Sequence, residues 1–434
     1  MSKPAPHAAP NSHSHHGEGT VLWTIWLAYG AFYFCRTNIS AAVPGLKESV
    51  DAGGLGLSAT EISYILGATK IAYATGQLLN GQLSEQVSPR KLLAIGMLGT
   101  AILNVLFGFG TALYFLIFIW ACNGYAQSLG WTPCVRVLAN WFPVASRGKV
   151  IGFVGTGYQA TAVATFLVSG YAAQTFGWRG ALWVPAGIMA LSAIVMLVFL
   201  REHPPSATGD DFEGESPAKL GPRNDPRNSV WENFLLTISN PSLWLLGISL
   251  GLLNACRYGF LDWGLTHLKE VQETGVGLAA LKYAVLPLGA VAGSYVAGWA
   301  TDRFFGSRRA PVTCILLVAL ALLSLTYDYV ARTSMPATIV LLVCIGFCIY
   351  GPQVLLVGTA PADLARRGTS AAAAGFVNCL GYVGAASGDY FTGRSLDAYG
   401  WERAIFIWAA WALGAAIAAG LLWNATADRG DKQV

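Results

Sequence analysis

Apolar stretches of about 20 residues recur along this chain between Val21 and Trp423, and a helix needs about 20 apolar residues to cross the hydrocarbon core of a bilayer. Hydrophobic residues make up 54% of the sequence and charged residues only 12%, about half the charged fraction of a soluble domain. The sequence therefore predicts an all-α membrane protein whose chain crosses a lipid bilayer many times.

We expect twelve transmembrane helices in two six-helix bundles, because the long polar segment 201–240 divides the apolar stretches six and six. The helices are predicted to begin near Val21, Thr60, Leu92, Tyr114, Lys149, Ala181, Pro241, Gly277, Val312, Pro336, Ser370 and Arg403. The predicted domains are a disordered cytoplasmic tail (1–20), an N-terminal bundle (21–200), a cytoplasmic linker (201–240), a C-terminal bundle (241–424) and a cytoplasmic tail (425–434). Most lysines and arginines outside the apolar stretches fall on the side of the two termini, which predicts that both termini are cytoplasmic.

Charge and composition also argue against several kinds of partner. The net charge of +4 is small for 434 residues and gives no reason to expect nucleic acid. The N-terminal tail contains four histidines but lacks the apolar core of a signal peptide, and we interpret it as a tail without a metal site. These histidines are His7, His13, His15 and His16. The eight cysteines lie in apolar stretches without disulfide or zinc spacing, so we expect no metal and no cofactor.

The two halves of the sequence resemble each other. GQLSEQVSPRK from Gly81 is similar to GWATDRFFGSRR from Gly298, and TFGWRGAL from Thr175 is similar to AYGWERAI from Ala398. Such internal similarity indicates a duplication. It makes Arg36 and Arg257 equivalent residues, each deep in the first apolar stretch of its half.

These two arginines predict an anionic ligand. An arginine deep in a membrane span is costly unless an anion or a water-filled cavity meets it, and a guanidinium forms two parallel hydrogen bonds with phosphate or carboxylate. The alternative for Arg257 is an ion pair with Asp262, although five residues turn the two side chains about 140° apart on a helix. Lys70 is a third cation, which either adds to the same potential or pairs with an acid on another helix.

Several segments resemble a known family. The loop motif around GQLSEQVSPRK is similar to that of the major facilitator superfamily. Segments that resemble its organophosphate:phosphate antiporters are FYFCRTN around Arg36, ATK at Lys70, NGYAQSLGWTPCVRVLANWF from Asn123, RYGFLDW from Arg257 and IGFCIYGP from Ile345. The resemblance implies a monomer with a cavity between two bundles, phosphate binding by Arg36 and Arg257, and positive potential from Lys70. It also implies exchange of an organophosphate for inorganic phosphate by alternating access.

Other residues near these segments are candidates for contact with the substrate, with plain packing as the alternative for each. They are Tyr33, Tyr73, Trp131, Asn254, Tyr258 and Asn378.

The sequence departs from the family at three positions. Thr37 replaces a lysine, Tyr158 replaces the histidine of the glycerol-3-phosphate branch, and Lys282 replaces an acid of that branch. Loss of a cation at Thr37 and replacement of an acid by Lys282 change the local charge from about +3 in the family to about +4 here, which favours a more anionic ligand. The four cations counted are Arg36, Lys70, Arg257 and Lys282. Candidates are phosphoenolpyruvate, phosphoglycerate or a hexose phosphate alongside glycerol-3-phosphate. Lys282 alternatively pairs with Asp389 or points to the outer interface.

Two further readings follow from the sequence. A membrane sensor of sugar phosphates that signals to a partner kinase would use the same arginines, and the lack of a long added cytoplasmic domain favours transport. An enzyme is disfavoured because no nucleophile, base and orienting group share a cavity.

Proton coupling is disfavoured because Glu61, Asp262 and Asp389 are interpreted as isolated acids near the ends of spans. Short loops and the lack of a transit peptide favour a bacterial inner membrane.

Overall fold

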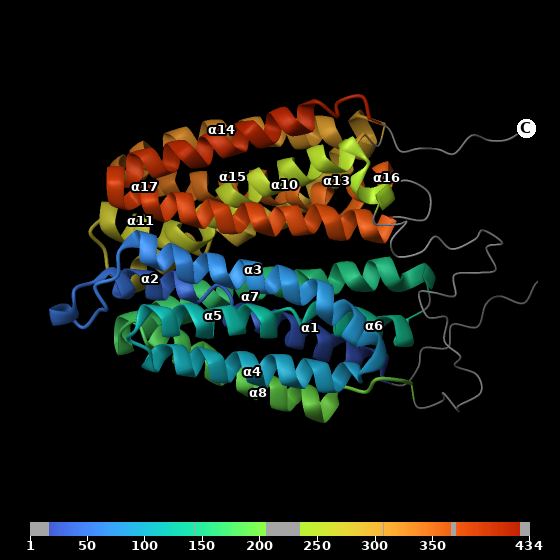
Figure 1. Ribbon diagram of the computed structural model, residues 1–434, viewed down its shortest axis with the longest axis horizontal. Helices are drawn as coiled ribbons and strands as arrows, with labels where there is room; N and C mark the ends of the chain where they lie inside the picture. Colours follow the sequence, from blue (N-terminus) through green and yellow to red (C-terminus); the bar gives the residue numbers. More distant parts are fainter. Residues whose placement is uncertain (1–16, 143, 205–234, 307, 366–369, 426–434) are drawn as a thin grey trace, which may run out of the picture.

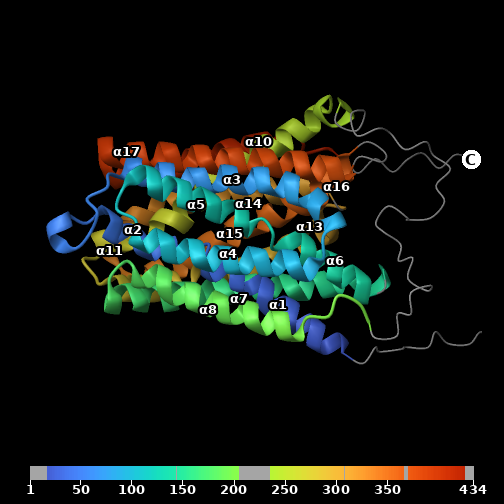
Figure 2. The same ribbon diagram turned by 60° about the horizontal axis from the view of Figure 1, so that its bottom comes forward.

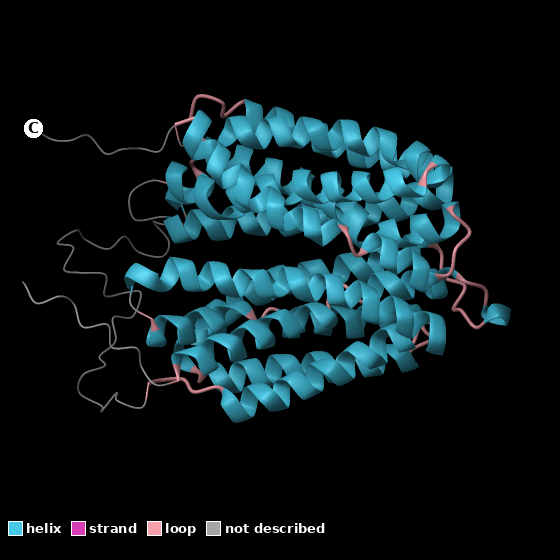
Figure 3. Cartoon of the chain, turned by 180° about the vertical axis from the view of Figure 1, so that it is seen from behind, coloured by secondary structure: helices cyan, strands magenta, loops and turns pink. Residues whose placement is uncertain are grey.

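The computed structural model describes residues 17–142, 144–204, 235–306, 308–365 and 370–425. Within these residues the regular structure is helical throughout and contains no strand, as Figure 3 shows. Eight of the described helical segments are long and apolar enough to cross a membrane. The prediction of an all-α membrane protein is therefore confirmed. The predicted tails up to residue 16 and from residue 426, including the four tail histidines, lie outside the described residues, as does most of the predicted linker.

The helices of the first half form one bundle (Figure 1). They are α1 (Glu18–Phe34), α2 (Ile39–Lys47), α3 (Ala59–Gln86), α4 (Pro89–Phe109), α5 (Leu113–Gln127), α6 (Trp131–Trp141), α7 (Val144–Phe176) and α8 (Gly180–Phe199), with a short 3₁₀ turn η1 (Val50–Ala52) before α3. In two places a pair of helices, α1 with α2 and α5 with α6, forms one interrupted membrane-spanning segment, here called a leg. The first bundle therefore has six legs.

The helices of the second half form the other bundle. They are α10 (Pro241–Tyr258), the π-helical η3 (Gly259–Trp263), α11 (Gly264–Val271), α12 (Val276–Tyr283), α13 (Leu286–Phe304), α14 (Arg309–Thr333), α15 (Met335–Val354), the π-helical η4 (Leu355–Thr359), α16 (Ala360–Leu364) and α17 (Ser370–Gly420). Gly400, at φ 76° and ψ −169°, interrupts α17 and divides it into two antiparallel legs. The twelve legs begin within five residues of the predicted starts, the largest difference being Val144 against Lys149.

Both described ends of the chain lie at the same end of the molecule (Figure 2). We call this the terminal end and the other the opposite end. Large apolar side chains such as Phe109, Tyr114 and Phe118 are exposed on the outside of the bundles, which is typical of a surface that faces lipid. The exact domain boundaries stay a prediction, because residues 205–234 are not described.

The two bundles meet tightly at the opposite end. Lys47 Nζ lies 2.6 Å from Glu270 Oε1, and Glu270 also accepts a hydrogen bond of 2.6 Å from the indole of Trp401. Glycine permits the close approach, because a Cβ on Gly393 would lie 2.4 Å from the carbonyl oxygen of Ala59 in the other bundle. These contacts between the bundles close the opposite end of the interface in which the two arginines lie.

Candidate functional site

A cavity lies between the two bundles. Its walls combine cations, an acid, amides and aromatic rings from both halves. The lining residues are Arg36, Ile39, Leu66, Thr69, Lys70, Tyr73, Trp120, Asn123, Gly124, Gln127, Tyr258, Asp262 and Tyr382. The lining therefore includes Arg36, Lys70, Tyr73 and Tyr258 of the predicted set. Arg257 does not line the cavity but lies over the ring of the lining residue Tyr258.

Arg36 lies in the break between α1 and α2, where the chain leaves helical geometry at Cys35. Amide side chains of α5 satisfy the carbonyl groups that the break exposes: Gln127 Nε2 donates to Phe32 O at 3.1 Å, and Asn123 Nδ2 donates to Cys35 O at 3.2 Å. Buried backbone carbonyls need such partners. The same Gln127 accepts a hydrogen bond of 3.1 Å from Arg36 Nε, so one side chain both holds the break and orients the guanidinium.

Aromatic rings hold the rest of the Arg36 guanidinium. Its Cζ lies 4.7 Å from the ring centroid of Tyr33 and 4.8 Å from that of Tyr73, within cation–π range. Its Nη2 is buried and has no hydrogen-bond partner. A charged donor is thus left without an acceptor at the cavity wall.

Arg257 has a closely similar setting in the other half. It lies in the last turn of α10, directly before the π-helical turn η3, and π-helical turns are frequent at functional sites. Its guanidinium lies over the rings of Tyr258 and Tyr350 at 4.8 and 5.0 Å, and Nη2 donates to the Tyr350 hydroxyl at 3.4 Å. The Nε atom is buried without a partner. Tyr33 interacts electrostatically with Arg257 as well as with Arg36, so the two arginines share one aromatic environment.

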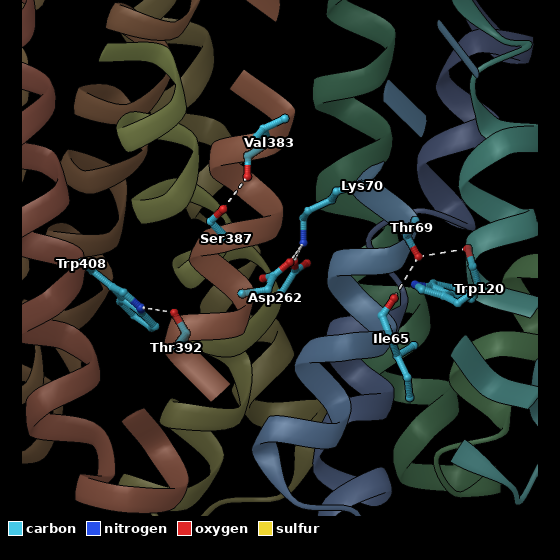
Figure 4. Close-up of polar contacts among 10 residues, drawn as sticks. Ile65, Thr69, Lys70, Trp120, Asp262, Val383, Ser387, Thr392 and Trp408 are labelled. Atoms are coloured by element: carbon cyan, nitrogen blue, oxygen red, sulfur yellow. Dashed lines mark hydrogen bonds and ion pairs between the residues drawn. The ribbon is translucent and has the colours of Figure 1, made fainter. Parts of the chain in front are cut away.

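Lys70 does not stay an unpaired cation. Its Nζ lies 2.6 Å from Asp262 Oδ2, and the two side chains point at each other in Figure 4. Lys70 also forms an ion pair with Asp389 of α17 and lies 4.3 Å from the ring centroid of Tyr258. The prediction that Asp262 and Asp389 are isolated acids near span ends is therefore wrong: they meet on one ammonium between the bundles. Asp262 consequently does not pair with Arg257.

Lys282 lies away from the cavity toward which it was predicted to point. Its Nζ donates to Gln272 Oε1 at 2.7 Å, next to the α11–α12 connection, and Lys282 is not among the residues that line the cavity. Asp389 is engaged by Lys70, so the alternative Lys282–Asp389 pair is not formed either. The expected local charge of about +4 was wrong because it counted Lys282 and ignored both carboxylates.

The remaining predicted residues do not line the cavity. Tyr158 stacks on Tyr33 with ring centroids 5.1 Å apart, and Trp131 packs on Tyr29 at 4.7 Å. Asn254 Nδ2 donates to the carbonyl of Gly381 at 3.1 Å, joining α10 to α17. Asn378 is half-buried.

Sequence reasoning missed several lining residues. Asn123 and Gln127 lie in the segment that begins at Asn123 and resembles the antiporter family, and a polar side chain inside an apolar span is itself a signal of function. Tyr382 and Trp120 carried no such signal, because aromatic residues are common in apolar spans. Tyr382 packs on Tyr73 with centroids 4.9 Å apart, which completes the aromatic wall across the bundles.

Comparisons with known proteins agree with this architecture. The sequence profile of the Major Facilitator Superfamily matches residues 25–389 and 273–433. The membrane sensor protein UhpC of Escherichia coli (strain K12) is 30% identical over 391 residues, which cover 88% of this chain and 87% of that protein. The glycerol-3-phosphate transporter of Bacillus subtilis (strain 168) is 28% identical over 92% of this chain and 91% of its own. The chain belongs to the organophosphate:phosphate antiporter family of this superfamily.

A third relative in the antiporter family is the phosphoglycerate transporter protein of Salmonella typhimurium (strain LT2), 27% identical over 89% of this chain and 84% of that protein. A solved structure of a bacterial homolog to the human lysosomal transporter Spinster, inward-facing and unoccupied, has a TM-score of 0.76 at 16% identity and covers 94% of this chain and 96% of that one. This likeness confirms the fold. Each of the five segments that resemble the antiporter family contributes a residue to the cavity or to the surroundings of Arg257.

Proposed function

We propose that this protein exchanges a phosphorylated organic anion for inorganic phosphate across a bilayer by alternating access, and that Arg36 and Arg257 bind the phosphoryl group. The observation that carries the proposal is the pair of buried guanidinium groups at repeat-equivalent positions, one at the break after α1 and one beside the π-helical turn η3, each with an N–H group that lacks an acceptor. A buried charged donor without a partner costs more than the 1–3 kcal/mol of a neutral one. A phosphoryl group supplies the missing acceptors.

Relatives in the family support this class of substrate. They are named as transporters of glycerol-3-phosphate, hexose phosphate and phosphoglycerate. The charged groups at the cavity refine the expectation: Arg36, Arg257 and Lys70 are balanced in part by Asp262 and Asp389, which leaves a formal sum of +1. The charge no longer gives a reason to prefer a ligand with an extra carboxylate. Glycerol-3-phosphate and hexose phosphates are therefore as good candidate substrates as phosphoglycerate and phosphoenolpyruvate.

The same charges suggest why movement would be coupled to exchange. Closing both sides of the cavity around unpaired guanidinium groups removes them from water without compensation, which costs several kcal/mol. A bound phosphoryl group offsets that cost, so the loaded protein changes conformation more readily than the empty one. Inward movement of an ester is then linked to outward movement of phosphate.

The experiment that tests exchange uses purified protein in proteoliposomes loaded with labelled inorganic phosphate. We expect efflux of the label to rise at least tenfold when unlabelled glycerol-3-phosphate or phosphate is added outside. Equal efflux with and without an external ester or phosphate would contradict exchange.

A second candidate function is a sensor, because the relative at 30% identity is a membrane sensor protein. A sensor would bind the ester in the same cavity but exchange it slowly. Uptake of labelled ester at micromolar concentration separates the two: rapid uptake supports a carrier, whereas tight binding without uptake favours the sensor.

We further infer a monomer in a bacterial inner membrane. Both termini are inferred to be cytoplasmic because most lysines and arginines outside the apolar stretches fall on the side of the termini. This orientation puts Asp51, exposed in the loop between α2 and α3, outside the cell membrane. An Asp51→Cys variant should react with a membrane-impermeant thiol reagent in spheroplasts. Protection of this cysteine until the membrane is broken would reverse the orientation.

A further inference from the structure

Two carboxylates share one ammonium at mid-depth between the bundles. The side chains of Lys70, Asp262 and Asp389 are 7%, 7% and 0% exposed, so little water reaches them. Asp389 binds Lys70 through Oδ2, whereas its Oδ1 is buried without a hydrogen-bond partner. The indole Nε1 of Trp263 interacts with this carboxylate, but neither Nε1 nor Oδ1 has a partner within hydrogen-bond geometry. The cluster thus holds one negative charge more than it balances, and one acceptor oxygen is left free.

The groups around this cluster decide whether the extra charge is tolerated. Tyr258 and Tyr283 interact with the cluster, Arg36 and Tyr382 line the same cavity, and Arg257 lies beyond Tyr258. Tyr258 joins the cluster to the arginines, because Lys70 and Arg257 both lie on its ring. On the neighbouring α2 and α11, Lys47 and Glu270 form an ion pair with each other toward the opposite end, and His267 Nε2 lies 2.7 Å from Asp328 Oδ1 of α14.

The occupancy of the cavity changes this balance. With all groups ionised, three cations and two carboxylates leave the empty site at a formal charge of +1, which disfavours a further positive charge. A phosphate ester is mostly dianionic above its second pKa of about 6, so a bound ester brings the sum to −1. In a cavity of low dielectric such a surplus is costly, and one proton returns the sum to zero.

We propose that Asp262 and Asp389, bridged by Lys70, form a proton-binding site that fills when a dianionic phosphate ester occupies the cavity. The inference rests on the proposed function, because it needs the ester beside the two arginines. The proton comes from the solvent on the side of loading and forms an O–H bond at the free Oδ1 of Asp389. It returns to solvent when the ester leaves on the other side, so that no charge or atom is left over in the cycle.

The site would also act on the contact between bundles. Lys70 belongs to α3, whereas Asp262 and Asp389 belong to η3 and α17 of the other half. A proton on Asp389 converts one of the two ion pairs across the interface into a hydrogen bond from the Lys70 ammonium to a neutral carboxyl group, which lacks the attraction between opposite charges. Loading with ester and proton together therefore loosens the bundles at mid-depth, which helps the loaded protein to change conformation.

The test measures protons bound with the ester, using purified full-length protein and glycerol-3-phosphate at pH 8, where this ester is dianionic. Binding calorimetry in buffers of different ionisation enthalpy gives the proton count. We expect about one proton per ester for the wild type and none for Asp389→Asn. The exposed Asp51→Asn, an identical change of side chain outside the cavity, should behave as the wild type. Asp262→Asn provides a second variant, expected to take up no proton, in case Asp389→Asn does not fold.

Affinity against pH gives an independent readout. If one proton binds with the ester, the wild-type affinity falls about tenfold per pH unit above neutrality, whereas that of Asp389→Asn is flat. Binding of the ester without a proton in the wild type, or with the same proton count in Asp389→Asn, would overturn the inference and leave the proposed function standing. No binding of the ester by folded wild-type protein would overturn both.

Discussion

The carboxylate of Asp397, in α17 of the second bundle, accepts a hydrogen bond of 2.7 Å from the backbone amide of Thr60 at the start of α3 in the first. Its other oxygen accepts one of 2.9 Å from the amide of Ala59. The first amides of a helix lack partners within it and carry a partial positive charge. A side chain of one bundle thus caps a helix of the other, and the cap exists only while the opposite end is closed.

Replacing Asp397 by asparagine should loosen this closed end. The amide side chain keeps one acceptor but loses the charge, and hydrogen bonds to charged groups are about twice as strong as neutral ones. We expect hydrogen exchange at the amides of Ala59 and Thr60 to become about tenfold faster or more. Asp51→Asn, on the loop just before α3, should leave this rate unchanged. Unaltered exchange in Asp397→Asn would mean that the cap does not hold the end closed.

A methyl group at Gly393 should block the approach of the bundles. Its Cβ would lie 2.4 Å from the carbonyl oxygen of Ala59 and 2.6 Å from Ser63 Cβ, so backbone would have to move, and overpacking of this kind costs about 1–3 kcal/mol. Gly393→Ala should lower the rate of phosphate exchange about tenfold. Gly298→Ala, whose Cβ would meet nothing within 4 Å, is the matched control. Equal rates in the two variants would show that close contact here is not needed for transport.

Removal of Lys70 should destabilise the protein strongly, because it leaves Asp262 and Asp389 facing each other without a counter-charge. Breaking a buried ion pair by deleting one partner typically costs about 3–5 kcal/mol. We expect Lys70→Met to lower the thermal unfolding temperature in detergent by several degrees. Adding Asp262→Asn and Asp389→Asn to the same chain should recover most of the loss, and a triple variant no more stable than Lys70→Met would argue against charge as the cause.

Gln127 should determine how firmly Arg36 is held. Gln127→Leu removes the acceptor of Arg36 Nε and the donor to the carbonyl of Phe32. The guanidinium loses its orientation and the helix break loses a partner, so the dissociation constant for phosphate should rise about ten- to a hundredfold while the protein still folds. Equilibrium binding of labelled phosphate measures this. A dissociation constant equal to that of the wild type would remove Gln127 from the site.

The sequence predicted the fold well because the signals for it are local. The twelve helix starts follow from apolar length and polar breaks, and the equivalence of Arg36 and Arg257 follows from the repeat. Arg36 proves to lie at a break between two helices and Arg257 beside a π-helical turn, which a count of apolar residues does not reveal. The helix break at Cys35 depends on Asn123 and Gln127 of α5, and contacts between distant segments leave no local pattern.

The ion pairs and the net charge at the cavity were the features that the sequence predicted least well. Asp262 and Asp389 are 127 residues apart in the chain, and nothing in their own surroundings indicates that they meet on Lys70. Lys282 was counted toward the cavity because it replaces an acid of the related glycerol-3-phosphate branch, but in the structure its Nζ donates a hydrogen bond to Gln272. Which acids neutralise which bases is decided by how the two bundles are packed together.

The measurement that tests the central claim most directly is exchange of labelled inorganic phosphate in proteoliposomes containing wild-type protein, Arg36→Lys or Arg257→Lys. Lysine keeps the charge but cannot form the two parallel hydrogen bonds of a guanidinium. We predict a loss of at least a hundredfold in each variant, whereas Arg332→Lys, at an exposed position, exchanges as the wild type does. Exchange at the wild-type rate in either cavity variant would contradict phosphate binding by the two arginines.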